Sequence, residues 1–174
     1  SLVQGLHMYK EVPEGDIVPG LMHPSLGGYE IGDIEIVAAF DIDVNKVGKD
    51  LSEAVFADPN NTMKFSDVPH MGVKVDRGMT HDGIGKYLAD VVIKSPESTV
   101  DVAGILHDRD VDVVINYLPV GSDEATKWYV EQVLSAKCGF INCVPVFIAR
   151  EDYWQKRFES RGLPMIGDDI KSQL

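Results

Sequence analysis

The 174-residue sequence has few of the features that mark membrane, secreted or nucleic-acid-binding proteins. No apolar run approaches the roughly 18 residues that a membrane-spanning helix needs. The two cysteines, Cys138 and Cys143, fit neither a CxxC motif nor a zinc pattern. We therefore expect two buried thiols in a reducing compartment, with the cytoplasm as the default location. Only 16 Lys and Arg face 28 Asp and Glu, a formal net charge of −12, which argues against nucleic acid and against anionic membrane surfaces as partners.

The sequence also lacks the glycine-rich loop that usually follows the first strand of a dinucleotide-binding domain. Gly27 and Gly28 follow no predicted strand and cannot serve as that loop. The five histidines show no ligand spacing and no paired acid, so no metal site is predicted. What remains is an ordinary globular composition, 44% hydrophobic and 25% charged, over a length that suits one domain.

Short apolar runs alternate with amphipathic segments along the chain. This alternation predicts an α/β fold, a Rossmann-like doubly wound parallel sheet connected by right-handed crossovers. The run at 111–118 is nearly continuous, which is typical of parallel strands buried on both faces. The predicted strands are Ile34–Asp41, Val111–Leu118, Gly139–Val144 and Leu163–Ile166, and the main predicted helices are Val44–Phe56, Ser122–Ala136 and Glu151–Ser160.

Ligands of such sheets bind beyond the carboxyl ends of the strands, where three polar stretches lie. The first is AAFDID, residues 38–43, which ends a predicted strand with Asp41. In dinucleotide-binding folds an acid at this place binds the adenosine ribose hydroxyls, and its charge repels the 2′-phosphate of NADP. Asp41 or Asp43 can equally cap the helix predicted to begin at Val44, and the residues leave both interpretations open.

The second stretch, NYLPVGSDEAT at 116–126, joins a strand to the start of a helix. Free backbone N–H groups at a helix N-terminus can hold an anion or a carbonyl oxygen, and Ser122 is the predicted cap. Asp123 and Glu124 disfavour a phosphate here, so contact with a neutral part of a cofactor is favoured. An ordinary capped turn between a strand and a helix explains the same residues.

The third stretch is GDDIKS at 167–172. The adjacent Asp168 and Asp169 cannot both point the same way, so one is expected in the crevice and the other in solvent. Lys171 can supply a positive charge to a substrate phosphate or oxyanion. A solvated turn is the alternative.

Together these stretches resemble the bacterial myo-inositol-1-phosphate synthases, also called inositol-3-phosphate synthases. In that family a first strand and a GxGNCAS loop precede a stretch like SLVQGL, and a dimerising catalytic region follows one like GDDIKSQ. The resemblance therefore implies an interior fragment, in which residues 1–174 are part of the NAD-binding domain and the catalytic and dimerisation domain is absent. It rests on VPGLMH (18–23), VAAFDIDVNKVGKDLSEAVFADPNNT (37–62), DGIGKYLAD (82–90), NYLPVGSDEAT (116–126), INCVPVFIA (141–149) and GLPMIGDDIKSQ (162–173).

The resemblance implies an isomerase of inositol and phospholipid biosynthesis. Such enzymes convert glucose 6-phosphate to myo-inositol 3-phosphate with tightly held NAD and no net redox change, and act as homo-oligomers, here expected to be tetramers. Lys171 and Asp168 are the expected catalytic residues, and the fragment alone is expected to be inactive. A generic NAD-dependent dehydrogenase and a non-catalytic nucleotide-binding module remain as alternatives. The expected NAD-binding residues are Asp41, Asp50, Tyr129, Asp168 and Ser172, which match family positions, together with Ser122 from the helix start.

Overall fold

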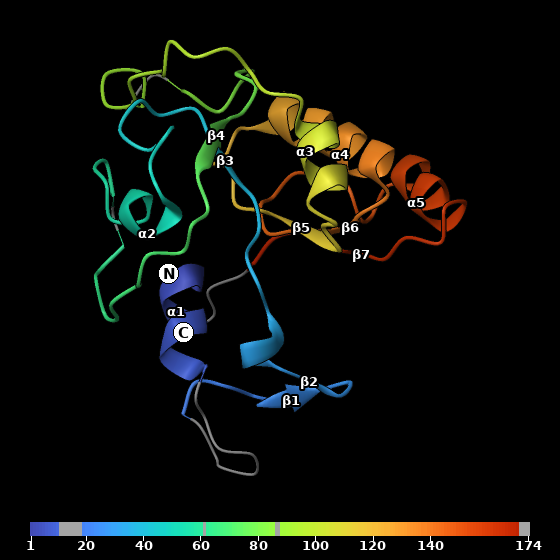
Figure 1. The fold of residues 1–174 in the computed structure, drawn as a ribbon. Coiled ribbons are helices and arrows are strands. Elements are labelled where there is room, and N and C mark those ends of the chain that lie inside the picture. The colour runs from blue at the N-terminus through green and yellow to red at the C-terminus, as the bar shows by residue number, and fades with distance from the viewer. Residues whose placement is uncertain (11–18, 61, 86–87, 171–174) are drawn as a thin grey trace.

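The computed structural model describes residues 1–10, 19–60, 62–85 and 88–170 (Figure 1). A helix comes first, an antiparallel hairpin and a 3-10 helix follow it, and strands then alternate with helices. In chain order the elements are α1 (Leu2–Tyr9), β1 (Ser25–Leu26), β2 (Tyr29–Glu30), the 3-10 helix η1 (Ile31–Asp33), β3 (Ala39–Asp41), α2 (Leu51–Ala54), β4 (Val75–Arg77), α3 (Val102–Asp108), β5 (Val113–Asn116), α4 (Asp123–Ala136), β6 (Gly139–Asn142), α5 (Asp152–Glu159) and β7 (Met165–Ile166).

The strands from β3 onward form two parallel sheets. One pairs β3 with β4, and the other has the order β5-β6-β7. Each predicted strand contains one of these observed strands, and the strands within each sheet run parallel because helices or longer segments connect them. The predicted α/β fold with parallel sheets is therefore confirmed, and the arrangement is consistent with a Rossmann-like domain.

The two parallel sheets are not hydrogen-bonded to each other in the described part of the chain, where β3 pairs only with β4 and β5 only with β6. They meet through side chains instead. Phe40 of β3 packs against the core beneath α4, and its ring centroid lies 6.3 Å from that of Tyr129.

One face of the three-stranded sheet is covered by α3, α4 and α5 (Figure 1). Val114 points into this covered face, whereas Val113 and Ile115 point the other way and are 42% and 39% exposed. The prediction that the run 111–118 is buried on both faces is therefore wrong. Among the described residues, helices pack against only one side of the strand.

The main core lies between this sheet and the helices. Val130 and Val133 of α4 are fully buried, and Phe140 of β6 stacks on Phe158 of α5 with centroids 6.4 Å apart. The predicted helices Ser122–Ala136 and Glu151–Ser160 are thus confirmed within one residue at their ends. In the described ranges, no helix is both long and apolar enough to cross a membrane.

The helix predicted over Val44–Phe56 is wrong for most of its length, since α2 covers only Leu51–Ala54. Gly48 adopts φ +86°, a conformation that ends a right-handed helix. Asp50 then caps a new helix start by accepting a hydrogen bond from the Ser52 N–H. Val47, Leu51 and Ala54 are buried, but the glycine and the cap divide the segment into a turn and a short helix.

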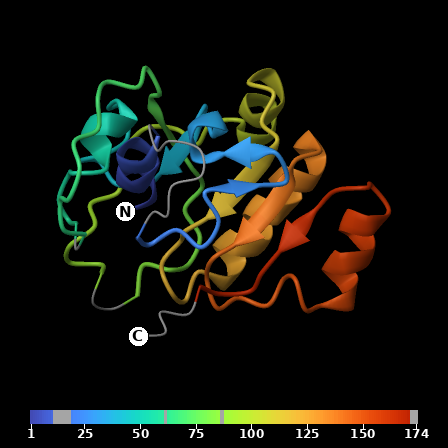
Figure 2. The same cartoon turned by 90° about the horizontal axis from the view of Figure 1, so that it is seen from below.

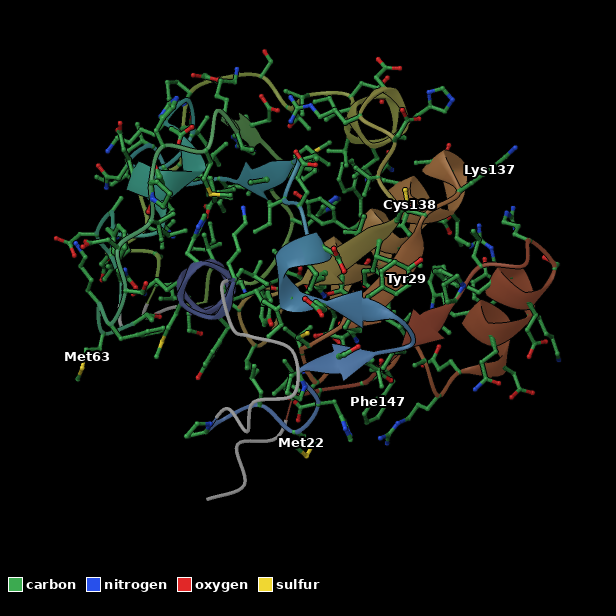
Figure 3. The ribbon with its side chains drawn as sticks, turned by 60° about the horizontal axis from the view of Figure 1, so that its bottom comes forward. Met22, Tyr29, Met63, Lys137, Cys138 and Phe147 are labelled. Carbon is green, nitrogen blue, oxygen red and sulfur yellow. The ribbon has the colours of Figure 1, made fainter. Side chains whose placement is uncertain are left out.

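The hairpin of β1 and β2 was not predicted. Gly27 and Gly28 form its two-residue turn with φ of +64° and +87°, the left-handed values that a tight hairpin turn requires. Figure 2 shows the hairpin in front of the three-stranded sheet, on the face opposite the helices. Exposed apolar side chains are common on the loops as well, and Met22 and Met63 project outward from them (Figure 3).

Candidate functional site

Asp41, for which the sequence leaves a ribose-binding and a capping role open, stands at the carboxyl end of β3. Its Oδ1 accepts hydrogen bonds from the N–H groups of Ile42 at 2.7 Å and Asp43 at 2.9 Å. Its Oδ2 lies 3.4 Å from Lys46 Nζ, and the side chain is 32% exposed. Asp43, by contrast, is buried and accepts from the Asn45 N–H at 2.7 Å. Asp43 thus serves the local turn, while Asp41 is partly exposed and its Oδ2 faces Lys46, a mobile side chain that a ligand can share or displace.

A cavity of about 170 Å³ borders this carboxylate. Three polar side chains, Asp41, Lys46 and Asn60, stand around walls that are otherwise apolar. Ligand sites commonly combine apolar walls with a few polar groups, although whole-ligand pockets are larger. The cavity can hold a small part of a ligand, and the Asp41 carboxylate can accept hydrogen bonds from hydroxyl groups there. The apolar walls come from β3, α2 with its following residue, and β4, through Ala39, Phe40, Leu51, Ala54, Val55 and Val75.

Tyr129 reaches this place from α4, against Phe40 of β3. Burial raises the pKa of its hydroxyl far above the ordinary value, and the charge of Asp41 raises it further. The hydroxyl is therefore neutral at ordinary pH and can donate a hydrogen bond. A Cβ at Gly78 would collide with this hydroxyl, so glycine is needed there for Tyr129 to approach the end of the sheet.

Arg77, which no pattern in the sequence singles out, ends β4 directly opposite Asp41 in the parallel register. The residue is buried, and its guanidinium donates to the carbonyl oxygens of Gly78 and Ser95 and to Thr80 Oγ1. These acceptors fix the segments that follow β4. Two of the three residues of β4 are charged, so no apolar run marks this strand or its end in the sequence.

The N-terminus of α4 is already occupied by a carboxylate of this chain. Asp82 accepts hydrogen bonds from the N–H groups of Glu124 at 2.8 Å and Ala125 at 2.9 Å. Burial alone would raise the pKa of Asp82, but these backbone N–H groups outweigh it and lower the pKa. The helix start is therefore capped from a distant loop and does not offer these two N–H groups to a ligand.

Ser122 lies beneath that same loop. It is the N-cap residue of α4, but its side chain makes no capping hydrogen bond, contrary to the prediction. The residue is buried, and a Cβ at Gly83 would run into its hydroxyl. Ser122 thus supports the packing of the loop that carries Asp82, and a cofactor would reach it only if that loop moved.

Asp168 is enclosed by hydrogen-bond donors. Its Oδ1 accepts from Asn142 Nδ2 at 2.8 Å and from the Ala149 N–H at 3.0 Å. Its Oδ2 accepts from the N–H groups of Ile148 at 3.0 Å and Arg150 at 3.4 Å. The side chain is only 1% exposed. This carboxylate therefore ties the segment after β7 to the segment after β6.

The hydrogen bonds of Asp168 belong to a larger polar network that crosses the carboxyl ends of β5 and β6. Asn142, at the end of β6, also donates to the carbonyl of Val146 at 2.7 Å. Asn116, at the end of β5, donates to Asn142 Oδ1 at 2.9 Å and to Thr126 Oγ1 of α4 at 3.1 Å. Sequence analysis missed these amides. The signal was present, because each is a polar residue that ends an otherwise apolar strand.

Asp50 lies apart from these clusters. Its Oδ1 accepts from the Ser52 N–H and hydroxyl and from the Met71 N–H, and its Oδ2 lies 3.5 Å from His70 Nδ1. Burial alone would raise the pKa of Asp50, but the hydrogen bonds outweigh it and lower the pKa to about 2. These contacts make Asp50 a cap of α2 and a clamp on the loop before β4.

Of the expected site residues, the structure brings Asp41 and Tyr129 together. Asp50, Ser122 and Asp168 occupy three other clusters, each engaged with its own chain partners. Lys171 and Ser172 lie outside the described residues. The described part of the chain thus provides one open carboxylate beside a cavity, and several polar groups that position the surrounding loops.

Comparison with known proteins shows which proteins this chain resembles. The chain is 52% identical over all 174 residues to the inositol-3-phosphate synthase of Mycolicibacterium smegmatis, and it covers 48% of that protein. It is 48% identical, again over its full length, to the synthase of Corynebacterium glutamicum, of which it also covers 48%. The chain thus spans about half the length of the curated relatives it matches.

A solved structure has a similar fold. The crystal structure of Ari2 superposes with a TM-score of 0.81 at 34% identity, covering 99% of this chain and 51% of that one. No family model matches the sequence. Along its whole length the chain is thus similar to curated inositol-3-phosphate synthases, of which it covers about half.

Proposed function

We propose that this chain provides the dinucleotide-binding part of an inositol-3-phosphate synthase that uses NAD and acts on glucose 6-phosphate. The observation that carries the proposal is the open carboxylate of Asp41 beside a cavity at the carboxyl end of β3, in a chain about 50% identical to named synthases. Ribose-binding acids occupy this position in dinucleotide-binding sheets. The relatives are about twice as long, so the whole activity is proposed for the protein and not for these residues alone.

In this proposal NAD accepts a hydride from the sugar phosphate and later returns it, so that no net oxidation occurs. Asp41 accepts the ribose hydroxyls, and the neutral Tyr129 hydroxyl donates at the same end of the sheet. Asp168 holds the segment 167–170 in place through its four hydrogen bonds. Lys171 supplies positive charge to the substrate. The proposed oligomer is the tetramer that the family resemblance implies.

The test uses this chain and a chimera in which residues 1–174 replace the homologous half of the Mycolicibacterium smegmatis protein. We expect the chimera to form inositol phosphate from glucose 6-phosphate when NAD is present, as measured by coupled phosphate release. The chain alone should form none, because the groups that stabilise the oxyanion are expected elsewhere. Lys171→Ala in the chimera should lower turnover at least 100-fold, the order of effect of removing one such donor. The exposed Lys156→Ala serves as the matched control.

Net redox separates this reaction from that of a dehydrogenase. A dehydrogenase would accumulate NADH in proportion to the sugar phosphate consumed, whereas the proposed reaction leaves NADH absorbance nearly constant while product forms. A chimera that folds and binds NAD but forms NADH and no inositol phosphate would overturn the proposal in favour of a dehydrogenase. Turnover by the bare chain would overturn the proposal that other residues are required.

A further inference from the structure

We propose that Lys46 sets the choice between NAD and NADP, by offsetting the charge with which Asp41 would otherwise reject the 2′-phosphate. This inference rests on the proposed function, since it assumes that a dinucleotide binds at Asp41. From the sequence, Asp41 alone was expected to exclude NADP. The structure places a cation beside that acid, and the two charges must be considered together.

The two side chains form one unit at the mouth of the cavity. Lys46 Nζ lies 3.4 Å from Asp41 Oδ2, and the side chains are 26% and 32% exposed. Both line the cavity of about 170 Å³, and among the described lining residues Lys46 is the only cation. A ligand that places a ribose against Asp41 therefore also comes within reach of the ammonium group.

The backbone holds the lysine in this position. The N–H of Lys46 donates to the Asp43 carbonyl at 3.0 Å, and the Asp43 N–H donates to Asp41 Oδ1 at 2.9 Å. Asp43 itself is buried. The turn that carries Lys46 is thus built on the same residues that orient Asp41, so the cation and the acid share one rigid support.

The cation opposite Asp41 in the sheet has other partners. Arg77 is the register partner of Asp41, but its guanidinium donates to Gly78, Ser95 and Thr80. A ribose 2′-phosphate carries close to two negative charges and would meet Asp41 with strong repulsion in a partly buried site. Lys46 is the group placed to reduce that repulsion, and its flexible stem lets the ammonium move from Asp41 toward a phosphate.

The test is isothermal titration calorimetry of NAD and NADP with the chimera described above. Four variants are compared with the unmodified protein, namely Lys46→Gln, Asp41→Asn, the double variant, and Lys49→Gln as an exposed control on the same turn. We expect Lys46→Gln to raise the ratio of the NADP Kd to the NAD Kd by about three- to tenfold. Lys49→Gln should leave the ratio within about twofold.

The double variant provides a second readout. Asp41→Asn should lower the Kd ratio, because it removes the repelling charge and leaves Lys46 free to pair with the phosphate. In the double variant, Lys46→Gln should raise the ratio of the NADP Kd to the NAD Kd again and cancel most of the effect of Asp41→Asn. Raising the salt from about 50 mM to about 500 mM should shrink these differences, as screening requires of a charge effect at a partly exposed site.

The outcomes are distinguishable. If the unmodified chimera binds NAD but Lys46→Gln and Lys49→Gln give the same Kd ratio, this inference is overturned and the proposed function stands. If the unmodified chimera binds neither dinucleotide, the proposed function fails and the inference fails with it. A changed ratio that does not respond to salt would also overturn it, because the effect would then not be electrostatic.

Discussion

The sharpest stability prediction concerns the two adjacent aspartates of the GDD stretch. Changing Asp168 to Asn should destabilise the protein strongly, whereas the same change at Asp169 should have almost no effect. Asp168 accepts four hydrogen bonds, two at each carboxylate oxygen, in a nearly fully buried position. Asp169 is exposed. Asn tolerates its positive φ of 74°, so the control adds no backbone strain.

The magnitude follows from the donors. Whichever oxygen of Asp168 becomes an amide NH₂, two N–H donors lose their acceptor and face another donor. Hydrogen bonds to a charged group contribute about 1.5–3 kcal/mol each, and an unsatisfied buried donor costs about 1–3 kcal/mol. We therefore expect a loss of roughly 3–5 kcal/mol, a large part of the ~5–15 kcal/mol that stabilises a typical domain.

The measurement is urea unfolding followed by far-UV circular dichroism. With a urea dependence of about 2 kcal/mol per molar, the midpoint for Asp168→Asn should fall by roughly 2 M. The midpoint for Asp169→Asn should stay within about 0.3 M. Equal midpoints for the two variants would refute the reasoning, because the hydrogen-bond network would then not stabilise the fold.

Three further predictions follow from the other clusters. Gly27→Ala places its Cβ in open space and should cost only the strain of a positive φ, about 1 kcal/mol or 2–4 °C in melting temperature. Gly83→Ala adds a collision with Ser122 to that strain, so it should lower the melting temperature at least twice as far. The pKa of Asp50 is lowered in the folded protein, so its stabilisation of about 2 kcal/mol should be complete above the ordinary pKa of 3.8 and lost as the pH falls toward 2. The urea midpoint should therefore fall less between about pH 5 and pH 2.5 in Asp50→Ala than in the unmodified protein. Asp82→Asn removes the negative charge from the start of α4 and should lower the free energy of unfolding by about 1 kcal/mol in the same assay, and an unchanged value would mean that this cap does not contribute.

The architecture could be predicted because the relevant signal is local. Buried parallel strands read as apolar runs, and all four predicted strands contain an observed one. Their lengths could not be predicted, because a strand lasts only as long as a partner pairs with it. The run 34–41 keeps only Ala39–Asp41, opposite Val75–Arg77, and β7 keeps two residues.

Some residues of the candidate site could also be predicted from the sequence, whereas others could not. Asp41 could be predicted from its place after an apolar strand. Asp82 could not, because its partners on α4 lie 42 and 43 residues further along the chain. The amides of Asn116 and Asn142 are 26 residues apart, and their contact depends on the parallel register of β5 and β6. Long-range hydrogen bonds of this kind carry no spacing signal within one sequence.

The structure gives Asp168 and Asp169 different surroundings, which bear on the roles that the family resemblance implies for them. The family resemblance assigns Asp168 to catalysis and to the cofactor, yet two donors occupy each of its carboxylate oxygens. A group so engaged acts on a reaction by holding other groups in place. The N–H groups of Asp169 and Ile170 are held in turn, by the carbonyls of Asn142 at 3.2 Å and Cys143 at 3.3 Å.

The segment that leads to Lys171 is therefore fixed to the end of β6 by both backbone and side-chain bonds. We infer that Asp168 is a positioning residue for this segment, and that the exposed Asp169, whose side chain has no hydrogen-bond partner among the described residues, is the carboxylate that can meet a ligand. In the chimera, Asp168→Asn should then lower kcat while substrate added in excess fails to restore it, since misplacing a catalytic group affects the transition state. Asp169→Asn should act mainly on KM. The opposite assignment, with KM changed by Asp168→Asn and kcat by Asp169→Asn, would show that Asp168 leaves its four donors to touch the ligand.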